Sequence, residues 1–272
     1  MAGRGESSDF VEALARGLDV LAAFSERQPR MSLADVAGAT GLARPTARRL
    51  LLTLTELGFV RQHGSEFELT PRVLDLGYAY ISSLGLWDAA RPHLEELVRH
   101  TNESSSMAQL SGSDIVYMAR VAVPKIIALR VEIGTRFPAV VTSQGKVLLA
   151  ALDEATLMET LATPSHSNVV IAARDHTELG RELSRVRAQG WALADEELAP
   201  GVRSIAAPVR DGHGVVRAAV NVTVHAAETS VEELTSRHLP ALLKAASAIS
   251  GDWARLEARP YESASEVVQR IL

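Results

Sequence analysis

Three arginines are crowded into one short stretch of a chain that is acidic as a whole. Arg44, Arg48 and Arg49 lie between Ala43 and Leu52, a segment without an acidic residue or a glycine. The whole chain has 28 Lys and Arg against 33 Asp and Glu, which leaves a net charge of -5. A guanidinium group can bind guanine O6 and N7 or hold a phosphate. The segment therefore predicts a local nucleic-acid contact, because the global charge gives no attraction to a polyanion.

The motifs that resemble catalytic sites each lack a necessary residue. "SQGKV" ends like a phosphate-binding loop, but Val140 stands where the first glycine belongs and Val147 where a Ser or Thr would hold magnesium. A triad can be written from Ser143, His166 and Asp175, yet no G-x-S-x-G sequence surrounds the serine. The chain has no cysteine, and its eight histidines form no H-E-x-x-H or i, i+4 pair. We therefore expect no catalytic residue, no metal and no cofactor, with a small-molecule hydrolase as the enzyme alternative.

Three helices and a hairpin are predicted around the arginines. Apolar residues recur every three or four positions over 10–24 and again from Pro45, a residue favoured at the first helical position. Between these helices, Ser32 can cap a short helix that ends at Gly41, where positive φ permits a sharp turn. The segment "GFVRQHGSEFELTP" predicts two strands joined by a glycine-containing turn. Residues 8–71 are therefore predicted to form a winged helix-turn-helix DNA-binding domain.

In such a domain the start and the outward face of the third helix enter the major groove, and the hairpin serves as a wing. The residues expected to contact DNA are Arg44, Thr46, Arg48 and Arg49 on the helix, with Arg61 and His63 on the hairpin. The alternative is a winged helix that binds another protein and leaves its arginines solvated. That alternative predicts no salt-dependent DNA affinity, whereas a DNA-binding protein shows strong salt dependence.

The remainder of the chain predicts a linker helix over 72–87, an α+β domain over 88–258 and a tail over 259–272. Hairpins such as "VRDGHGVVRAAVNVTV", with a glycine-rich turn, indicate an antiparallel sheet rather than a doubly wound one. The expected strands are 106–110, 115–121, 127–133, 191–194, 202–209 and 215–224. The expected helices are 87–100, 143–152, 154–161, 177–189 and 230–257.

From its composition we expect a cytoplasmic protein. The absence of cysteine fits a reducing compartment. The opening "MAGRGESSDF" has no apolar signal region, and no stretch approaches the 18 or so apolar residues that a membrane helix needs. We therefore expect neither an export signal nor a membrane span.

Four blocks of sequence, in this order, resemble the IclR family of bacterial transcriptional regulators. They are "LADVAGATGLARPTARRLLLTLTELGFV", "LTPRVLDLGYAYI", "GTRFPAVVTSQGKVLLAAL" and "GWALADEELAPGVRSIAAPVRDGHGVVRAAVNVTVHA". The resemblance covers about residues 10–258. It implies a winged helix-turn-helix, a linker helix and a mixed α/β, GAF-like effector-binding domain. It also implies a double-stranded DNA operator, a small organic-acid effector, and a homodimer or a tetramer built as a dimer of dimers.

The resemblance also implies an effector pocket. Carried over position by position, its apolar walls would be Ile126, Leu129 and Phe137, and the backbone N–H groups of Ser143 and Gln144 would form an anion site at a helix start. Further polar contacts would come from Ser204, Asn221 and Thr223, of which the last two share a strand face.

The wording of these blocks is closest to the branch that regulates protocatechuate, 4-hydroxybenzoate and β-ketoadipate catabolism. An effector carboxylate could pair with Arg130, Arg136 or Arg203, each of which could instead be a structural or solvated arginine. Two positions depart from family patterns. Pro45-Thr46 opens the third helix where a Ser or Thr pair is common, and Ala194 replaces an acidic residue of some members, so the effector is expected to differ from glyoxylate.

Overall fold

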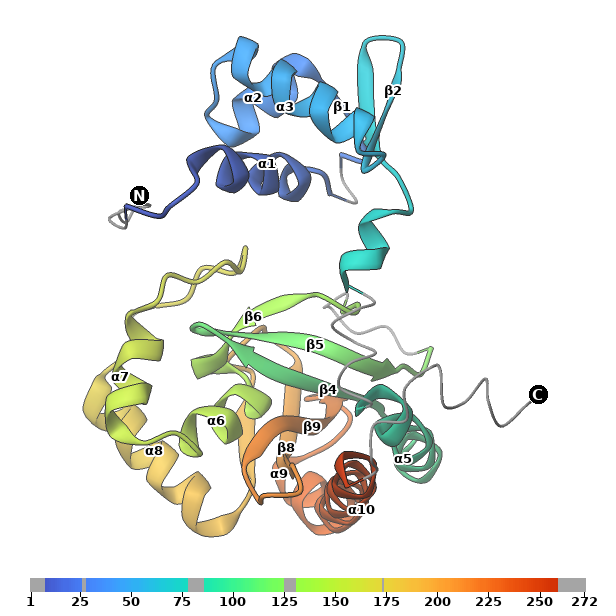
Figure 1. Ribbon diagram of the computed structural model, residues 1–272. Helices are drawn as coiled ribbons and strands as arrows, with labels where there is room; N and C mark the ends of the chain where they lie inside the picture. The colour runs from blue at the N-terminus through green and yellow to red at the C-terminus, as the bar shows by residue number, and fades with distance from the viewer. Residues whose placement is uncertain (1–7, 26–27, 78–85, 125–130, 173, 259–272) are drawn as a thin grey trace, which may run out of the picture. The chain divides into compact units, whose positions relative to one another are not determined.

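The computed structural model describes residues 8–25, 28–77, 86–124, 131–172 and 174–258 of the 272-residue chain (Figure 1). The chain divides into two compact units, Met1–Ser83 and Leu84–Leu272. Residues 73–77 are helical, as the predicted linker helix requires, whereas residues 78–85 lie outside the described part of the chain. The last two residues of that predicted helix, 86 and 87, already belong to the next helix. The predicted tail over 259–272 also lies outside the described residues.

The first unit is a three-helix winged helix-turn-helix. It comprises α1 (Glu12–Ala23), β1 (Arg30–Ser32), α2 (Leu33–Thr40), α3 (Arg44–Glu56), β2 (Val60–His63) and β3 (Glu66–Leu69). The strands form an antiparallel sheet in the order β1-β3-β2. Strand β1 was not predicted from the sequence, because three residues are too few for an alternating pattern to be read.

Local sequence explains how the turn between α2 and α3 forms. Ser32 and Asp35 make a reciprocal capping box at the start of α2, and Gly41 ends that helix with φ of 67°. Helix α3 starts at Arg44 after Ala43, which supplies no side-chain cap, so Pro45 is its second residue rather than the predicted first. Proline is tolerated in this first turn because its missing N–H would have no helical partner there.

The second unit is an antiparallel sheet with helices on both faces (Figure 1). Its strands run in the order β6-β5-β4-β9-β8-β7, so that segments far apart in the sequence become neighbours. They are β4 (Ser104–Ser111), β5 (Asp114–Val121), β6 (Arg136–Pro138), β7 (Ala192–Asp195), β8 (Val202–Arg210) and β9 (Val216–His225). The α+β fold class is confirmed.

Two apolar cores lie on the two faces of this sheet. Helices α5 (Leu86–Thr101) and α10 (Leu239–Glu257) cover one face, where Leu94, Val220 and Ile249 are fully buried. Helix α6 (Ser143–Ala150), preceded by the 3-10 turn Ala139–Val141, lies against the other face. Helices α7 (Glu154–Ala162) and α8 (His176–Gln189) follow, and α8 packs on α6.

One predicted element of this unit was wrong, and another is less regular than predicted. Residues 131–133 of the strand predicted over 127–133 are not strand, and residues 127–130 lie outside the described part of the chain. The edge strand is instead β6, which the sequence did not reveal because a proline sits within its three residues. The predicted helix over 230–257 is divided into α9 (Val231–Glu233), a π-helical turn (Leu234–His238) and α10. Pro240 lacks the N–H that would continue a regular helix, which accounts for the irregular turn.

Candidate functional site

Helix α3 presents unpaired arginines to solvent. Ala47, Leu51 and Leu54 anchor the helix in the core of the first unit. Because α-helical side chains three and four positions apart share a face, these anchors turn a second face outward. Arg44, Arg48 and Arg49 are exposed on it and Thr46 is half-buried. None of these arginines forms an ion pair within the described residues, so their donors are available to phosphates and base edges.

The basic side chains of the wing differ from the arginines of α3, because they share one carboxylate. Arg61 donates to Glu68 Oε1, His63 Nε2 lies 3.1 Å from the same oxygen, and Arg30 Nε donates to Glu68 Oε2 at 2.7 Å. Hydrogen bonds from Arg61 and Arg30 lower the pKa of Glu68 from its ordinary 4.5 to about 2. Arg61 and His63, the predicted wing contacts, are exposed, and both lie against the carboxylate of Glu68. The sequence did not indicate this pairing, which depends on the register of β2 and β3.

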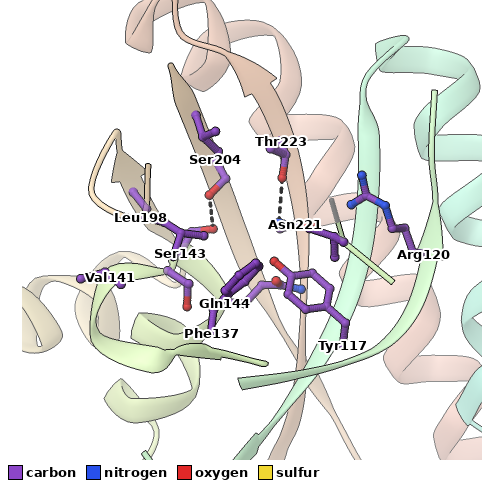
Figure 2. A pocket seen from close by; sticks show the side chains of 14 residues that line it. Tyr117, Arg120, Phe137, Val141, Ser143, Gln144, Leu198, Ser204, Asn221 and Thr223 are labelled. Carbon is purple, nitrogen blue, oxygen red and sulfur yellow. Dashed lines mark hydrogen bonds between the residues drawn. The ribbon is translucent and has the colours of Figure 1, made fainter. Parts of the chain in front are cut away.

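A pocket opens on the α6 face of the second unit, where five strands, β5 to β9, contribute side chains (Figure 2). Strand register sets these side chains in rows: Ser106 of β4 lies opposite both Arg120 of β5 and Asn221 of β9, and Thr223 lies opposite Ser204 of β8. Residues directly opposite each other point to the same face of a sheet. Between these side chains about 510 Å³ is not occupied by protein atoms, a volume that includes open solvent.

Hydrogen bonds fix most of the polar groups around this space. Arg120 Nη1 donates to Ser106 Oγ at 3.0 Å, and Asn221 Oδ1 accepts from the Ser106 N–H at 2.9 Å. Asn221 Nδ2 donates to Thr223 Oγ1 at 3.0 Å. Ser143 Oγ lies 2.8 Å from Ser204 Oγ, joining α6 to β8. The row is therefore rigid before any ligand arrives.

Helix α6 starts at the pocket, where Gly145 passes unusually close to the backbone of Ala139. Thr142 Oγ1 caps the helix by accepting from the Gly145 N–H at 3.1 Å. A Cβ on Gly145 would lie 2.1 Å from Ala139 O, so only glycine fits. Ser143 and Gln144 occupy the first two positions of the helix, whose N–H groups have no intrahelical partner. This placement agrees with the predicted anion site.

Two residues of β5 give the pocket its charge and one of its aromatic walls. Burial lowers the pKa of the half-buried Arg120 from its ordinary value, without removing its charge near neutral pH. No carboxylate among the described residues pairs with Arg120. Tyr117 packs edge-on against Phe137, with ring centroids 5.8 Å apart and planes at 86°, and burial raises the pKa of Tyr117 to about 12. Apolar contacts come from Val131, Val141, Leu198 and Val202.

The structure brings together six of the eight predicted effector residues: Phe137, Ser143, Gln144, Ser204, Asn221 and Thr223 all line the pocket. Ile126 and Leu129 lie outside the described part of the chain.

The arginine that lines the pocket was not among the three candidates. Arg130 lies outside the described residues. Arg136 donates to Ser111, and Arg203 bonds Asp195 at 2.6 Å and backbone carbonyls, so both are structural. The sequence analysis missed Arg120 and Tyr117. A usable signal was present, since Arg120 is the one charged residue between Ile115 and Val121, an otherwise apolar strand.

Metal-binding and membrane-spanning features are absent from the described residues. Within the described ranges, no three His, Cys, Asp or Glu side chains gather as metal ligands, and none of the helices has the length and apolarity to cross a bilayer. Ser143 bonds Ser204, whereas Asp175 caps α8 by accepting from the Glu178 N–H, so two of the three side chains of the possible triad bond to other groups.

A winged helix-turn-helix with available arginines, joined to a second domain that holds a polar pocket, defines a DNA-binding transcriptional regulator. Residues 13–64 match the IclR helix-turn-helix domain, and residues 78–251 match the C-terminal domain of the bacterial transcriptional regulator IclR. The chain belongs to the IclR family.

Relatives agree with this assignment. The Pca regulon regulatory protein of Pseudomonas putida is 41% identical over 239 residues, which cover 87% of this chain and 82% of that protein. The p-hydroxybenzoate hydroxylase transcriptional activator of Acinetobacter baylyi is 33% identical over 243 residues, which cover 87% of this chain and 89% of that protein. These relatives are regulators rather than enzymes.

Solved structures share the fold. A protein from Rhodococcus sp. RHA1 is 46% identical, with a TM-score of 0.77. The match covers 91% of this chain and 100% of that one. An IclR homolog from Microbacterium hydrocarbonoxydans, complexed with 4-hydroxybenzoate, has a TM-score of 0.77 at 24% identity. The match covers 90% of this chain and 99% of that one.

Proposed function

We propose that the pocket of the second unit binds a small aromatic carboxylate, and that this ligand controls how the winged helix-turn-helix binds its operator. The single observation that carries the proposal is Arg120. Its guanidinium is half-buried at the pocket, holds Ser106 with one donor, and has no carboxylate partner among the described residues. Guanidinium groups match carboxylates with two parallel hydrogen bonds.

The walls of the pocket favour a flat ring. Tyr117 and Phe137 already make an edge-to-face pair, and a third ring can join such a pair by offset stacking or edge contact. Val141 and Leu198 provide apolar surface nearby. The names of two relatives point the same way, since one regulates the pca regulon and the other activates p-hydroxybenzoate hydroxylase.

The protein is proposed to act in the cytoplasm as a homodimer or a dimer of dimers. An exposed apolar surface of the DNA-binding unit supports the assembly. An apolar stripe on and before α1 is left uncovered within its own unit, where Leu14 and Leu18 are 62% and 54% exposed. Two symmetric recognition helices would read a near-palindromic operator whose half-sites lie about one DNA turn, or a multiple of it, apart. Sedimentation of Leu14→Glu should then show a smaller oligomer than the wild type.

Control of the operator requires a coupling free energy between the two units. The effector must bind one arrangement of the paired DNA-binding domains better than another, and the operator must then alter effector affinity by the same factor. The helix predicted over 72–87 connects the units in sequence and is the proposed transmitter. Operator titrations with and without effector measure this coupling.

The decisive test is calorimetric titration of benzoate and its ring-hydroxylated derivatives into the purified protein. Arg120→Met should weaken binding by about 2 kcal/mol, roughly 30-fold, because it removes a charge-assisted contact. Arg136→Met removes the same charge outside the pocket lining and serves as the matched control. Equal affinity of Arg120→Met and wild type, or a loss confined to Arg136→Met, would refute the role of Arg120.

A further inference from the structure

Four charged side chains form a cluster outside the lining of the pocket. Lys146 of α6 is 1% exposed, and its ammonium pairs with Glu182 of α8 and with Glu197. Arg174 bonds the second oxygen of each carboxylate at 3.0 Å. None of the four side chains is among the described residues that line the pocket. The proposed ligand contacts therefore leave this cluster without a role.

The loop over 196–201, between β7 and β8, joins this cluster to the pocket. Its residue Leu198 lines the pocket and directly follows Glu197 in sequence (Figure 2). A backbone bond closes the base of the loop, from the Glu196 N–H to Val202 O at 2.9 Å. Glu197 instead bonds outside the loop, with one carboxylate oxygen on each cation of the cluster. These two bonds tie the segment that carries Leu198 to the body of the domain.

We infer that Glu197 is a positioning residue of the pocket, which holds Leu198 against the bound effector without touching the effector itself. The inference rests on the proposed function, because it assumes that a ligand occupies this pocket. Lys146 supplies the force that holds the loop. If the loop moved away, the ammonium would keep only one of its two carboxylates while it stayed desolvated, and such a loss is costly. The loop therefore stays in place, and Leu198 stays with it.

Glu182 separates this role from the general stability of the cluster. It pairs with the same two cations as Glu197, and the two side chains are similarly exposed, at 20% and 28%. Glu182 lies in α8, which contributes no residue to the described lining of the pocket. Removing either carboxylate changes the charge of the cluster equally, whereas of the two only Glu197 adjoins a pocket residue.

Calorimetric titration of the full chain measures the effect, with the benzoate derivative that binds the wild type most tightly as the probe. Leu198→Ala sets the scale, because the loss of most of an apolar side chain from a ligand site should weaken binding about tenfold. Glu197→Ala should weaken binding about fivefold, since Leu198 is no longer held in place, and Glu182→Ala should remain within about twofold of wild type. Should Glu197→Ala fail to fold, Glu197→Gln replaces it, because it keeps one oxygen for the cations.

Hydrogen exchange gives a readout that needs no ligand. The amides of Leu198 and Ala199 should exchange faster in Glu197→Ala than in the wild type, and at the wild-type rate in Glu182→Ala, because only the first variant frees the loop. Equal exchange in the two variants, whether accelerated or unchanged, would overturn the inference.

A double-mutant cycle shows whether Glu197 acts through Leu198. If it does, the double variant should lose about tenfold, no more than Leu198→Ala alone, whereas independent losses would multiply to about 50-fold. Independent losses, an unchanged affinity in Glu197→Ala, or an equal loss in Glu182→Ala would overturn the inference while the proposed function stands. If no acid binds the wild type, the proposed function fails and the inference fails with it.

Discussion

Replacing Lys146 should destabilise the second unit through a buried charge network. Its side chain is 1% exposed, and Nζ donates to Leu193 O at 3.0 Å. The same ammonium pairs with Glu182 and Glu197, and Arg174 bonds the second oxygen of each carboxylate at 3.0 Å. Two cations thus balance two anions. Lys146→Met preserves most of the side-chain volume but leaves two carboxylates with one cation.

The size of the loss follows from how deeply each partner is buried. Removing one member of a buried ion pair costs about 3–5 kcal/mol, chiefly because the abandoned charge stays desolvated. Glu182 and Glu197 are 20% and 28% exposed, so water recovers part of that cost. We therefore expect a decrease of about 3 kcal/mol in the free energy of unfolding, the lower end of the range.

Urea denaturation followed by tryptophan fluorescence measures this loss in the relevant unit. All three tryptophans, Trp87, Trp191 and Trp253, lie after residue 83, so the signal reports on the second unit even if the two units unfold separately. Adding Glu197→Gln to Lys146→Met removes the excess anion and leaves Glu182 paired with Arg174, which should restore most of the stability. A single variant within about 0.5 kcal/mol of wild type, or a double variant no more stable than the single one, would refute the reasoning.

Three further predictions concern both units. Gly145→Ala should lower the melting temperature and abolish acid binding, because its methyl group would collide with the Ala139 backbone; thermal unfolding and calorimetry together check this, and unaltered binding would contradict it. Arg49→Ala should weaken operator binding and reduce the slope of log affinity against log salt by about 0.9 if it neutralises one phosphate, with an unchanged melting curve. Folding lowers the pKa of Glu68 from 4.5 to about 2, so its contribution to stability is complete above pH 4.5 and is lost as pH falls toward 2. The stability difference between wild type and Glu68→Gln should therefore shrink over that window, and a constant difference in acid denaturation would exclude the effect.

Elements with strong local signals could be read from the sequence. The Ser32 cap, the turn at Gly41 and the apolar stripe that continues through Leu51 specified the helix-turn-helix, because each acts within a few residues along the chain. The two-residue period of β9 likewise placed Asn221 and Thr223 on one face, and both line the pocket. The resemblance in the α6 segment placed Ser143 and Gln144 at a helix start, where the structure has them.

Other features depended on which strands became neighbours. Arg120 was passed over for Arg130, Arg136 and Arg203, because its place in an otherwise apolar strand did not show that β5, β4 and β9 meet at Ser106. The pairing within the wing follows from the register of β2 and β3, which sets Arg61 opposite Glu68. The edge strand β6 was missed for a different reason, since its three residues include a proline and are too few to show an alternating pattern.

The sequence by itself thus determined the local elements, the charge of the recognition helix and the family, because periodicity, caps and motifs act over short distances along the chain. Tertiary structure alone decided the chemistry of the pocket. The guanidinium of Arg120 bonds the hydroxyl of Ser106, 14 positions away in sequence, and the amide nitrogen of Gln144 bonds the carbonyl of the same residue, 38 positions away. Contacts over such separations are set by strand order and packing, for which no local pattern of residues gives a signal.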